Sequence, residues 1–294
     1  MVIMDGKEVS EALKKKIAAE VEEMVAAGYR RPKLVAVLVG DDGASQVYVG
    51  HKERACGQVG FDSEVIRMPA STTEEELNAV IDRLNGDENV DGFIVQLPLP
   101  AHLSEEAVIE RISPLKDVDG FHPETTGRMI SGLDAYLPAT PAGILELIKY
   151  YNIETAGKHC VVIGRSNIVG RPIANLLSMK GYPGDCTVTL CHSRTANLKE
   201  IVRGADIVIA ALGKAHFVTA DMIKEGAVVI DVGITRVADP SKKSGFRIAG
   251  DVDYDNVAPK CSYITPVPGG VGPMTIACLM QNTLKAARER IKRR

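Results

Sequence analysis

The chain has 294 residues, a formal net charge of -3 and a hydrophobic fraction of 45%. This length favours one large or two medium-sized domains, and the composition is that of a folded globular protein rather than a disordered one. A nucleic-acid-binding protein would show a basic domain or stripe, whereas the basic cluster here is confined to residues 288–294 and suits a helix end.

The cysteines and the apolar segments indicate the compartment. Six cysteines, at positions 56, 160, 186, 191, 261 and 278, form no CxxC pair, so neither a zinc ribbon nor a thioredoxin motif is supported. We expect them to be small buried residues in a reducing compartment. The four apolar residues at the N-terminus are too few for a signal-peptide core, and no stretch approaches the roughly 18 apolar residues of a membrane helix. The sequence therefore predicts a cytoplasmic protein that binds neither nucleic acid nor membrane.

The first part of the chain alternates predicted helices and strands. Apolar residues recur three or four positions apart from Val9 to Met24, which predicts a helix, and the continuous apolar run 34–39 predicts a buried strand. The pattern continues with a helix over 45–58, a strand over 63–68, a helix opening at 72–76, a strand over 92–97 and a helix near 104–112. This order is typical of right-handed βαβ crossovers and a parallel sheet.

The middle of the chain has a different composition. Residues 113–141 are rich in Pro, Gly, Asp and Thr and show little periodicity, so we interpret them as an ordered functional loop leading into a linking helix over 142–151. A plain linker is the alternative. A second α/β series then follows, with buried strands at 159–163, 186–192, 205–212 and 227–232, a helix over 172–180 and a last helix over 275–292.

The turn Gly164–Gly170 joins a predicted strand to a predicted helix, which is the context of a dinucleotide-phosphate loop. Gly164 permits a tight turn, Gly170 lets the helix pack close to the sheet, and the helix N-terminus offers N–H groups to a phosphate. The spacing is GxSxxxG rather than GxGxxG, so a strand–turn–helix junction without a nucleotide remains an alternative.

The end of the next strand indicates which dinucleotide is bound. NAD enzymes usually place an acid there for the ribose 2′-hydroxyl, but this strand ends in His192-Ser193-Arg194-Thr195. Arg194, together with Arg165 in the preceding loop, suits a 2′-phosphate because Arg makes charge-assisted contacts to phosphate oxygens. The sequence favours NADP over NAD, with solvated surface charges as the alternative.

Four polar residues are candidates for the chemistry. Tyr48 and Lys52 are four residues apart and share one helix face. In an apolar cleft, desolvation would disfavour the charged form of the lysine. Gln96 lies at the carboxyl end of a predicted strand, where open α/β sheets bind ligands. The acids at 117 and 119 lack further metal ligands at suitable spacing, so no metal is predicted. Asp119 could instead bind a ring with adjacent N–H donors. An exposed Lys, a core-edge Tyr and a capping amide are the alternatives.

The run 266–275 carries three glycines and three prolines directly before a helix. Pro268, Gly269 and Gly270 therefore indicate an unusual backbone that allows close approach to a ligand.

Together these motifs resemble the methylenetetrahydrofolate dehydrogenase/cyclohydrolase family over nearly the whole chain. The resemblance lies in YVxxK at 48–52, VQLPLP at 95–100, DVDGFHP at 117–123, TPxG at 140–143, GRSxxVGxP at 164–172, HSRT at 192–195 and ITPVPGGVGPMT at 264–275. One departure is Ala139, where the family commonly has a cysteine; we expect it to alter packing.

The resemblance implies an α/β protein of two domains with the catalytic cleft between them. Residues 1–141 plus 272–294 would form a discontinuous three-layer α/β domain that binds folate, and residues 142–271 a Rossmann-like NADP-binding domain. The implied activity is oxidation of 5,10-methylenetetrahydrofolate to the 5,10-methenyl form with NADP, followed by hydrolysis to 10-formyltetrahydrofolate. This places the protein in one-carbon metabolism, and family members are commonly homodimers.

The resemblance also implies roles for individual residues. Lys52 is the central catalytic residue, Tyr48 and Gln96 assist it, Asp119 anchors the pterin, and the loop with Pro268, Gly269 and Gly270 lines the folate and nicotinamide site. The implied cofactor-binding residues are Gly164, Arg165, Ser166, Ile168, Val169, Gly170, Ser193, Arg194, Ile234, Gly272 and Thr275.

Two other functions remain open at this point. One is a dehydrogenase without cyclohydrolase activity on the same scaffold, against which Tyr48, Lys52 and Gln96 argue. The other is a non-catalytic dinucleotide-binding protein, against which the presence of both sets of site residues argues.

Overall fold

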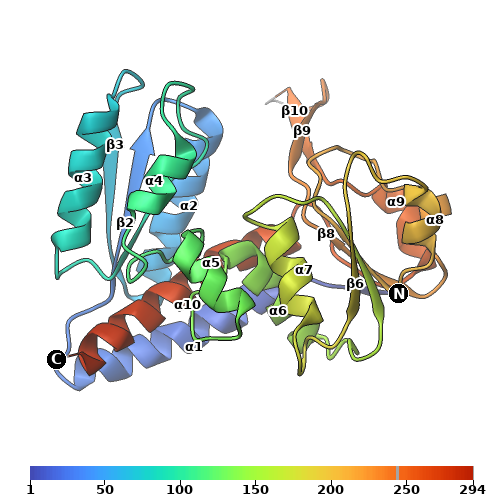
Figure 1. Cartoon of the computed structure of the whole chain (residues 1–294), viewed down its shortest axis with the longest axis horizontal. Coiled ribbons are helices and arrows are strands. Elements are labelled where there is room, and N and C mark those ends of the chain that lie inside the picture. Colours follow the sequence, from blue (N-terminus) through green and yellow to red (C-terminus); the bar gives the residue numbers. More distant parts are fainter. Residues whose placement is uncertain (243–244, 294) are drawn as a thin grey trace. The chain divides into compact units, whose positions relative to one another are not determined.

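The structure, a computed structural model, describes residues 1–242 and 245–293 and forms two units (Figure 1). One unit combines Met1–Ser10 with Thr140–Thr275 and is called here the six-strand unit. The other combines Glu11–Ala139 with Ile276–Arg294 and is called the three-strand unit. The chain therefore passes between the units within the first helix, at the start of the linking helix and within the last helix.

The three-strand unit is built on a parallel sheet in the order β3-β2-β4. Its strands are β2 (Lys33–Val39), β3 (Asp62–Met68) and β4 (Gly92–Val95). Its helices are α2 (Gly43–Val59), α3 (Glu74–Gly86), α4 (Glu105–Arg111) and α5 (Pro123–Ile130), with most of α1 (Gly6–Ala26) and α10 (Val271–Lys292).

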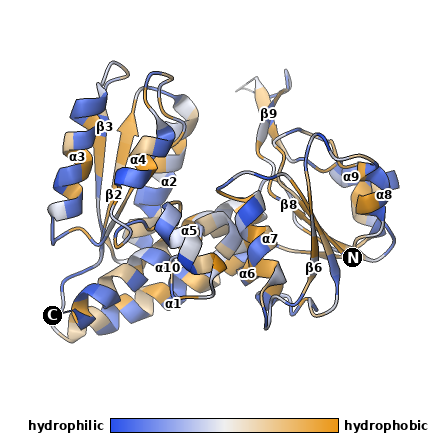
Figure 2. Cartoon of the chain, in the orientation of Figure 1, coloured by the Kyte–Doolittle hydropathy of each residue, from blue (hydrophilic) through white to orange (hydrophobic). Residues whose placement is uncertain are grey.

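Alternation along β2 divides its side chains between two apolar layers. Val35, Val37 and Val39 pack with Phe93 and with apolar residues of α3 and α4. On the other side of the unit, α2 and α10 meet where Cys56 Sγ lies 3.7 Å from Met280 Sδ. Figure 2 shows the apolar strands of this unit bordered by helices that each carry hydrophilic residues. This three-layer arrangement buries a parallel sheet on both faces.

The six-strand unit contains a parallel sheet in the order β1-β11-β8-β7-β5-β6. The strands are β1 (Val2–Ile3), β5 (His159–Ile163), β6 (Thr187–Cys191), β7 (Ile207–Ala210), β8 (Ala227–Asp231) and β11 (Cys261–Ile264). A separate antiparallel pair comprises β9 (Thr235–Ala238) and β10 (Phe246–Ala249).

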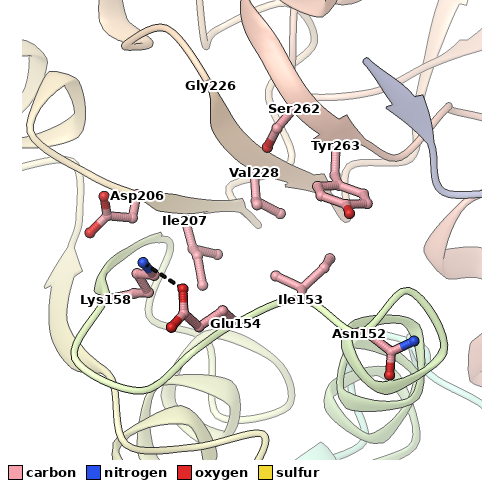
Figure 3. Close-up of a pocket in the computed structure, with 10 residues that line it drawn as sticks. All are labelled: Asn152, Ile153, Glu154, Lys158, Asp206, Ile207, Gly226, Val228, Ser262 and Tyr263. Atoms are coloured by element: carbon pink, nitrogen blue, oxygen red, sulfur yellow. Dashed lines mark ion pairs between the residues drawn. The ribbon is translucent and has the colours of Figure 1, made fainter.

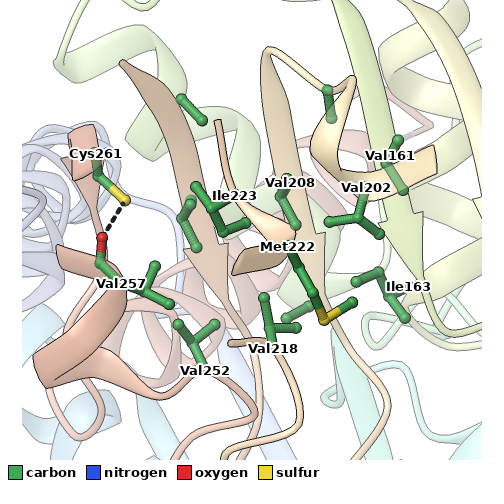
Figure 4. Packing of buried hydrophobic residues seen from close by; sticks show 14 of the residues in the cluster. Val161, Ile163, Val202, Val208, Val218, Met222, Ile223, Val252, Val257 and Cys261 are labelled. Carbon is green, nitrogen blue, oxygen red and sulfur yellow. Dashed lines mark hydrogen bonds between the residues drawn. The ribbon is translucent and has the colours of Figure 1, made fainter. Parts of the chain in front are cut away.

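Helices cover this sheet and bury its core. They are α6 (Ala139–Tyr150), α7 (Gly170–Ser178), α8 (Leu198–Arg203) and α9 (Tyr254–Val257), with the short 3-10 turns η1 (Ala220–Met222) and η2 (Ala258–Lys260). One face of the sheet, shown in Figure 4, packs Val161, Val208 and Val229 against Val202 of α8 and Met222 of η1. Helix α7 packs against β5 and β6.

The structure corrects the sequence interpretation in three places. Residues 113–141 contain the helix α5, which His122 caps by accepting a hydrogen bond from the Glu124 N–H and which Pro123 begins. The last helix begins at Val271 rather than at 275. The strand predicted at 186–192 is half exposed rather than buried, because β6 lies at an edge of the sheet.

The structure also adds a pairing that joins the start of the chain to the six-strand unit. Val2 and Ile3 pair with Tyr263 and Ile264 of β11, and the Met4 N–H donates to the Ile264 carbonyl at 2.8 Å. Sequence analysis placed residues 1–141 in one domain, whereas Met1–Ser10 cluster with the six-strand unit through these contacts.

Candidate active site

Lys52 and Gln96 form the polar centre of the three-strand unit. Helix α2 positions Lys52 and begins at Asp42, whose side chain accepts a hydrogen bond from the Ser45 N–H at 2.7 Å. Gln96 directly follows β4 and extends its ladder, because its N–H donates to the Val37 carbonyl at 2.9 Å. The Lys52 Nζ donates to Gln96 Oε1 at 3.0 Å.

The orientation of the Gln96 amide is fixed at its other end. Its Nε2 donates to the Leu97 carbonyl at 2.7 Å, so the acceptor oxygen faces the lysine. The capping-amide alternative for Gln96 therefore describes one of its two bonds, and the bond to Lys52 is the second.

Lys52 and Asp119 influence each other electrostatically. Burial lowers the pKa of Lys52, and the negative charge of Asp119 partly opposes this shift. Burial likewise raises the pKa of Asp119, and the positive charge of Lys52 opposes that shift. Both residues lose solvation in their charged forms, which brings the lysine closer to the range in which an amine exchanges protons at neutral pH.

The loop that carries Asp119 is tightly held. Asp117 accepts hydrogen bonds from the N–H groups of Phe121, at 3.1 Å, and His122, at 2.9 Å, and burial raises its pKa to about 6. Gly120 has φ +75°, and a Cβ there would lie 2.8 Å from the Pro138 nitrogen. From α10, Asn282 Nδ2 donates to the carbonyls of Val118 and Leu137, each at 2.8 Å. Asn282 was not identified from the sequence. An amide side chain among the apolar residues of the last predicted helix was the available signal.

Three further candidates in this unit have defined places. Tyr48 lies one turn before Lys52 on α2 and is 37% exposed. His51 is exposed on the same helix, and His122 caps α5. Ala139 starts α6 and is buried.

In the six-strand unit, the loop between β5 and α7 has the close backbone contacts expected of a phosphate-binding turn. Gly164 has φ +124°, and a Cβ there would lie 2.0 Å from the Ala211 carbonyl oxygen. A Cβ at Gly170 would lie 2.0 Å from the Gly164 carbonyl oxygen. Ser166 Oγ accepts from the N–H groups of Val169, at 3.2 Å, and Gly170, at 3.3 Å, while Arg165, Ser166 and Ile168 remain exposed.

The loop after the neighbouring strand β6 presents Ser193 and Arg194 at the surface. It is closed by hydrogen bonds from the His192 N–H to Thr195 Oγ1 at 2.9 Å and from the Arg194 N–H to His192 Nδ1 at 3.2 Å. The Gly164 N–H donates to the Cys191 carbonyl at 2.9 Å, so this loop and the glycine turn adjoin. Their exposed arginines and hydroxyls fit a phosphorylated dinucleotide.

The run 266–270 packs against the beginning of α1. A Cβ at Gly6 would lie 1.7 Å from the Gly270 carbonyl oxygen, and Gly269 has φ +111°. A cis peptide bond joins Val267 to Pro268. This is the unusual backbone that the prolines and glycines predicted.

The remaining cofactor candidates lie near the start of α10. A Cβ at Gly272 would meet the Ile234 Cδ1 at 3.9 Å, and Ile234 is 49% exposed. Thr275 Oγ1 lies 2.9 Å from Thr140 Oγ1. Lys52, Gln96 and Asp119 are thus brought together in one unit, and the dinucleotide candidates lie on loops and helix starts of the other.

Two buried carboxylates at the ends of these loops, Asp231 and Asp251, were not identified from the sequence. An acid directly after the apolar run 227–230 was the available signal.

The six-strand unit also has a pocket of about 330 Å³, away from the proposed dinucleotide loops (Figure 3). Asp206, Ile207 and Val228, among its lining residues, belong to the amino ends of β7 and β8. Ligands of parallel sheets bind at the carboxyl ends, so this pocket is separate from the loops above.

Within residues 1–242 and 245–293, no group of three or more His, Cys, Asp or Glu side chains is arranged to hold a metal ion. Over the same ranges, no helix has the length and apolar character needed to cross a membrane. All six cysteines are buried, and none of them forms a disulfide bond within the described residues.

Comparisons with known proteins match the chain to two domain models of one family. Residues 4–119 match the catalytic domain model of the tetrahydrofolate dehydrogenase/cyclohydrolase family, and residues 138–291 match its NAD(P)-binding domain model. The bifunctional protein FolD of Bacteroides thetaiotaomicron is 62% identical over 291 residues, which cover 99% of each chain.

Solved structures give the same result. The bifunctional FolD methylenetetrahydrofolate dehydrogenase/cyclohydrolase of Campylobacter jejuni is 45% identical, with a TM-score of 0.93 and 99% coverage of both chains. The Trypanosoma brucei methylenetetrahydrofolate dehydrogenase-cyclohydrolase, solved with NADP and an inhibitor, is 39% identical, with a TM-score of 0.94 and the same coverage.

The fold and its loops define a two-domain α/β enzyme with a Rossmann-like dinucleotide-binding domain. The chain belongs to the tetrahydrofolate dehydrogenase/cyclohydrolase family. The sequence predictions of the family, the fold class, the enzyme class and the NADP cofactor are thereby confirmed.

Proposed function

We propose that this protein oxidises 5,10-methylenetetrahydrofolate with NADP and hydrolyses the resulting 5,10-methenyltetrahydrofolate to 10-formyltetrahydrofolate. The observation that carries the proposal is the half-buried Lys52 amine, which donates to an oriented Gln96 amide and faces the charge of Asp119. Both reactions occur at the same one-carbon unit, so one amine serves both.

In the oxidation, a hydride leaves the methylene carbon and an iminium-like cation remains on the folate. NADP, when bound, supplies the hydride acceptor. A permanently charged amine beside the product cation would be repelled by it, and the lowered pKa of Lys52 reduces this repulsion. We assign Asp119 to the pterin, whose N–H donors suit a carboxylate.

In the hydrolysis, water adds to the methenyl carbon and loses a proton. The neutral Lys52 amine accepts this proton, and the ammonium form returns it to the folate nitrogen whose bond to the carbon breaks. The remaining hydroxyl proton of the adduct is released to solvent as the formyl C=O forms. Gln96 keeps Nζ directed, because its oxygen accepts from the amine while its nitrogen is held by the Leu97 carbonyl. Tyr48, one turn away on α2, is assigned to assist the lysine.

We assign the dinucleotide to the six-strand unit. The glycine turn at 164–170 suits the pyrophosphate, because side chains at Gly164 and Gly170 would collide with neighbouring carbonyls. The exposed Arg165, Ser193 and Arg194 suit the 2′-phosphate, which favours NADP over NAD. Ser166, Ile168, Val169, Ile234, Gly272 and Thr275 complete the proposed cofactor site, and Pro268, Gly269 and Gly270 the folate and nicotinamide site.

We further infer a cytoplasmic homodimer that acts in one-carbon metabolism and supplies purine and amino-acid biosynthesis. The six buried cysteines, which form no disulfide bond within the described residues, support a reducing compartment. Light scattering coupled to size-exclusion chromatography tests the dimer, and a mass equal to one chain would contradict it.

The test of the proposed function mixes the protein with 5,10-methylenetetrahydrofolate and NADP and records NADPH and methenyl absorbance together. Wild type should form NADPH and clear the methenyl compound faster than buffer. Lys52→Ala should lose about 10²- to 10⁴-fold in this clearance, which is the usual contribution of a general acid–base group. His51→Ala, an exposed neighbour on α2, is the matched control and should behave as wild type.

Other results would change the assignment. NADPH formation with methenyl decay at the buffer rate in wild type would make the protein a dehydrogenase alone. Dinucleotide binding without NADPH formation would make it non-catalytic. Full clearance by Lys52→Ala would remove the lysine from the mechanism.

A further inference from the structure

Asp231 and Asp251 are two buried carboxylates that the proposed chemistry does not use. Asp231 ends β8 and is 3% exposed, and Asp251 lies two residues after β10 and is fully buried. A buried carboxylate is costly unless hydrogen bonds replace its water, so the partners of these two residues show what they organise.

The Asp231 carboxylate binds backbone N–H groups of two segments, the loop after β8 and residues 251–252. Its Oδ1 accepts from the N–H groups of Gly233 and Asp251, each at 2.9 Å, and its Oδ2 accepts from the Val252 N–H at 2.9 Å. Its own N–H donates to Thr265 Oγ1 at 2.7 Å. The Asp231 side chain thus joins the loop after β8 to residues 251–252. Its backbone N–H adds the link to Thr265, which precedes the run 266–270.

Asp251 binds the loop after β7. Its Oδ2 accepts from the N–H groups of Leu212, at 2.7 Å, and Gly213, at 2.9 Å, and its Oδ1 accepts from the Lys214 N–H at 2.7 Å. Three successive backbone N–H groups therefore converge on one carboxylate. Such a concave backbone arrangement is stabilised by the anion that it surrounds.

The glycines beside the two carboxylates leave no room for a Cβ. A Cβ at Gly250 would lie 1.9 Å from Asp231 Oδ2, and a Cβ at Gly233 would lie 2.4 Å from Asp251 Oδ1. Burial raises the pKa of Asp231 to about 6, with a contribution from the charge of Asp251. The two acids and the glycines beside them form one packed cluster, called here the two-aspartate cluster.

The two-aspartate cluster lies where the far end of a dinucleotide would fall. In the sheet order β6-β5-β7-β8, the proposed 2′-phosphate residues follow β6 and the proposed pyrophosphate turn follows β5. Parallel strands bring their carboxyl ends to one edge, so a dinucleotide continuing across the sheet reaches the loops after β7 and β8. The loop held by Asp251 starts beside Gly164, since a Cβ there would lie 2.0 Å from the Ala211 carbonyl oxygen.

We propose that Asp231 and Asp251 are positioning residues that set the loops after β7 and β8 for the nicotinamide half of the dinucleotide. They act through the backbone N–H groups that their carboxylates accept, which belong to the loops after β7 and β8 and to residues 251–252. The inference rests on the proposed NADP-dependent oxidation. It predicts that these acids govern hydride transfer rather than binding of the adenosine half.

The test compares Asp251→Asn and Asp231→Asn with wild type in two measurements. The first is kcat and KM for NADP in the oxidation of 5,10-methylenetetrahydrofolate. The second is the affinity for adenosine 2′,5′-bisphosphate, the half of the cofactor that lacks nicotinamide, by calorimetry. Asp206→Asn is the matched control, because Asp206 also accepts a backbone N–H, from His159 at 2.8 Å, at the amino ends of the strands.

Both variants should lose about tenfold to hundredfold in kcat, since an amide replaces a carboxylate that accepts three N–H bonds. Their affinity for adenosine 2′,5′-bisphosphate should stay within about twofold of wild type, as should both properties of Asp206→Asn. Unchanged kcat in both variants overturns the inference. A parallel loss of bisphosphate affinity overturns it as well, because it would indicate a general structural role.

A milder variant covers the case in which the aspartate variants do not fold. Thr265→Val removes the hydroxyl that accepts from the Asp231 N–H, and it should lower kcat about twofold to tenfold with bisphosphate affinity retained. Unchanged kcat in Thr265→Val would then overturn the inference. Failure of wild type to reduce NADP would instead contradict the proposed function, and the two failures are therefore distinguishable.

Discussion

Each unit holds a pair of ionisable side chains, buried in the six-strand unit and half-buried in the three-strand unit, and the two pairs are satisfied in different ways. Asp231 and Asp251 each accept three backbone N–H groups, at distances of 2.7 to 2.9 Å. The Lys52 Nζ, with three protons to donate, makes its hydrogen bond in the described part of the chain to Gln96 Oε1, and Asp119 acts on it through charge.

The difference separates a structural use of buried charge from a chemical one. A carboxylate surrounded by backbone donors holds its loops in place and has little acceptor capacity left for a ligand. An amine with one fixed acceptor keeps its direction and retains protons that it can exchange. The following substitutions test this contrast, from the largest expected effect to the smallest.

Gly164→Ala tests whether the loops after β5 and β7 must touch. The added Cβ would lie 2.0 Å from the Ala211 carbonyl oxygen and would occupy a residue with φ +124°. Strain and overpacking together should weaken NADP binding by roughly 100-fold or more, measured by calorimetry. Gly157→Ala is the control, because Gly157 has φ +72° with open space around its Cβ position. Equal affinities of the two variants would show that the close approach is unimportant.

Gln96→Leu tests the hydrogen bond that Lys52 donates to Gln96 Oε1. Removing a hydrogen bond to a charged or ionisable group should slow methenyl hydrolysis about tenfold to hundredfold, because the amine loses its direction. Gln46→Leu, an exposed glutamine on α2, serves as the control. Hydrolysis at the wild-type rate in Gln96→Leu would mean that Lys52 is positioned by other contacts.

Arg194→Asp tests the exposed side of the dinucleotide site. Replacing the cation should lower the preference for NADP over NAD about tenfold, which is less than for a buried contact because the side chain is exposed and screened by salt. The measurement is the ratio of kcat/KM for the two cofactors. Lys180→Asp, an equal charge change on an exposed residue of the same unit, should leave the ratio unaltered. Full NADP preference in Arg194→Asp would refute the assignment of the 2′-phosphate site.

Asp117→Asn and Asp231→Asn test the titration of the structural acids, with the smallest expected effect. Burial raises the pKa of each in the folded protein to about 6, above the roughly 3.9 of an unfolded chain. Each acid therefore contributes stability that is present below pH about 4 and is lost as pH rises through about 6. The free energy of unfolding of wild type minus that of each variant should decrease from pH 4.5 to pH 7 in urea titrations. An increase in this value over the same pH range would show that the N–H donors outweigh desolvation.

Much of the fold could be predicted because its signals are local. The apolar runs 34–39 and 159–163 became β2 and β5, and the Thr73 capping box marked the start of α3. The missed elements depend on distant partners. The two-residue strand β1 exists through its pairing with β11, and α5 begins from a His122 cap inside a segment without periodicity.

The candidate site was predictable to a similar extent. Lys52, Gln96 and Asp119 are recognisable because family motifs surround them, and the structure brings them together. Asp231 and Asp251 were missed because each follows an apolar segment and resembles an ordinary strand end in the sequence. Their role depends on backbone N–H groups up to 39 positions away, which no local pattern shows.

The central claim is that Lys52 is an amine held by Gln96 with a reduced affinity for protons. The most direct measurement is an NMR titration of the lysine side chains in protein labelled with ¹³C-lysine, with Lys52 assigned from the signal missing in Lys52→Arg. The account predicts that Lys52 titrates below the ordinary lysine value of about 10.4, because burial disfavours its charge. Titration of Lys52 at or above that value would contradict the account.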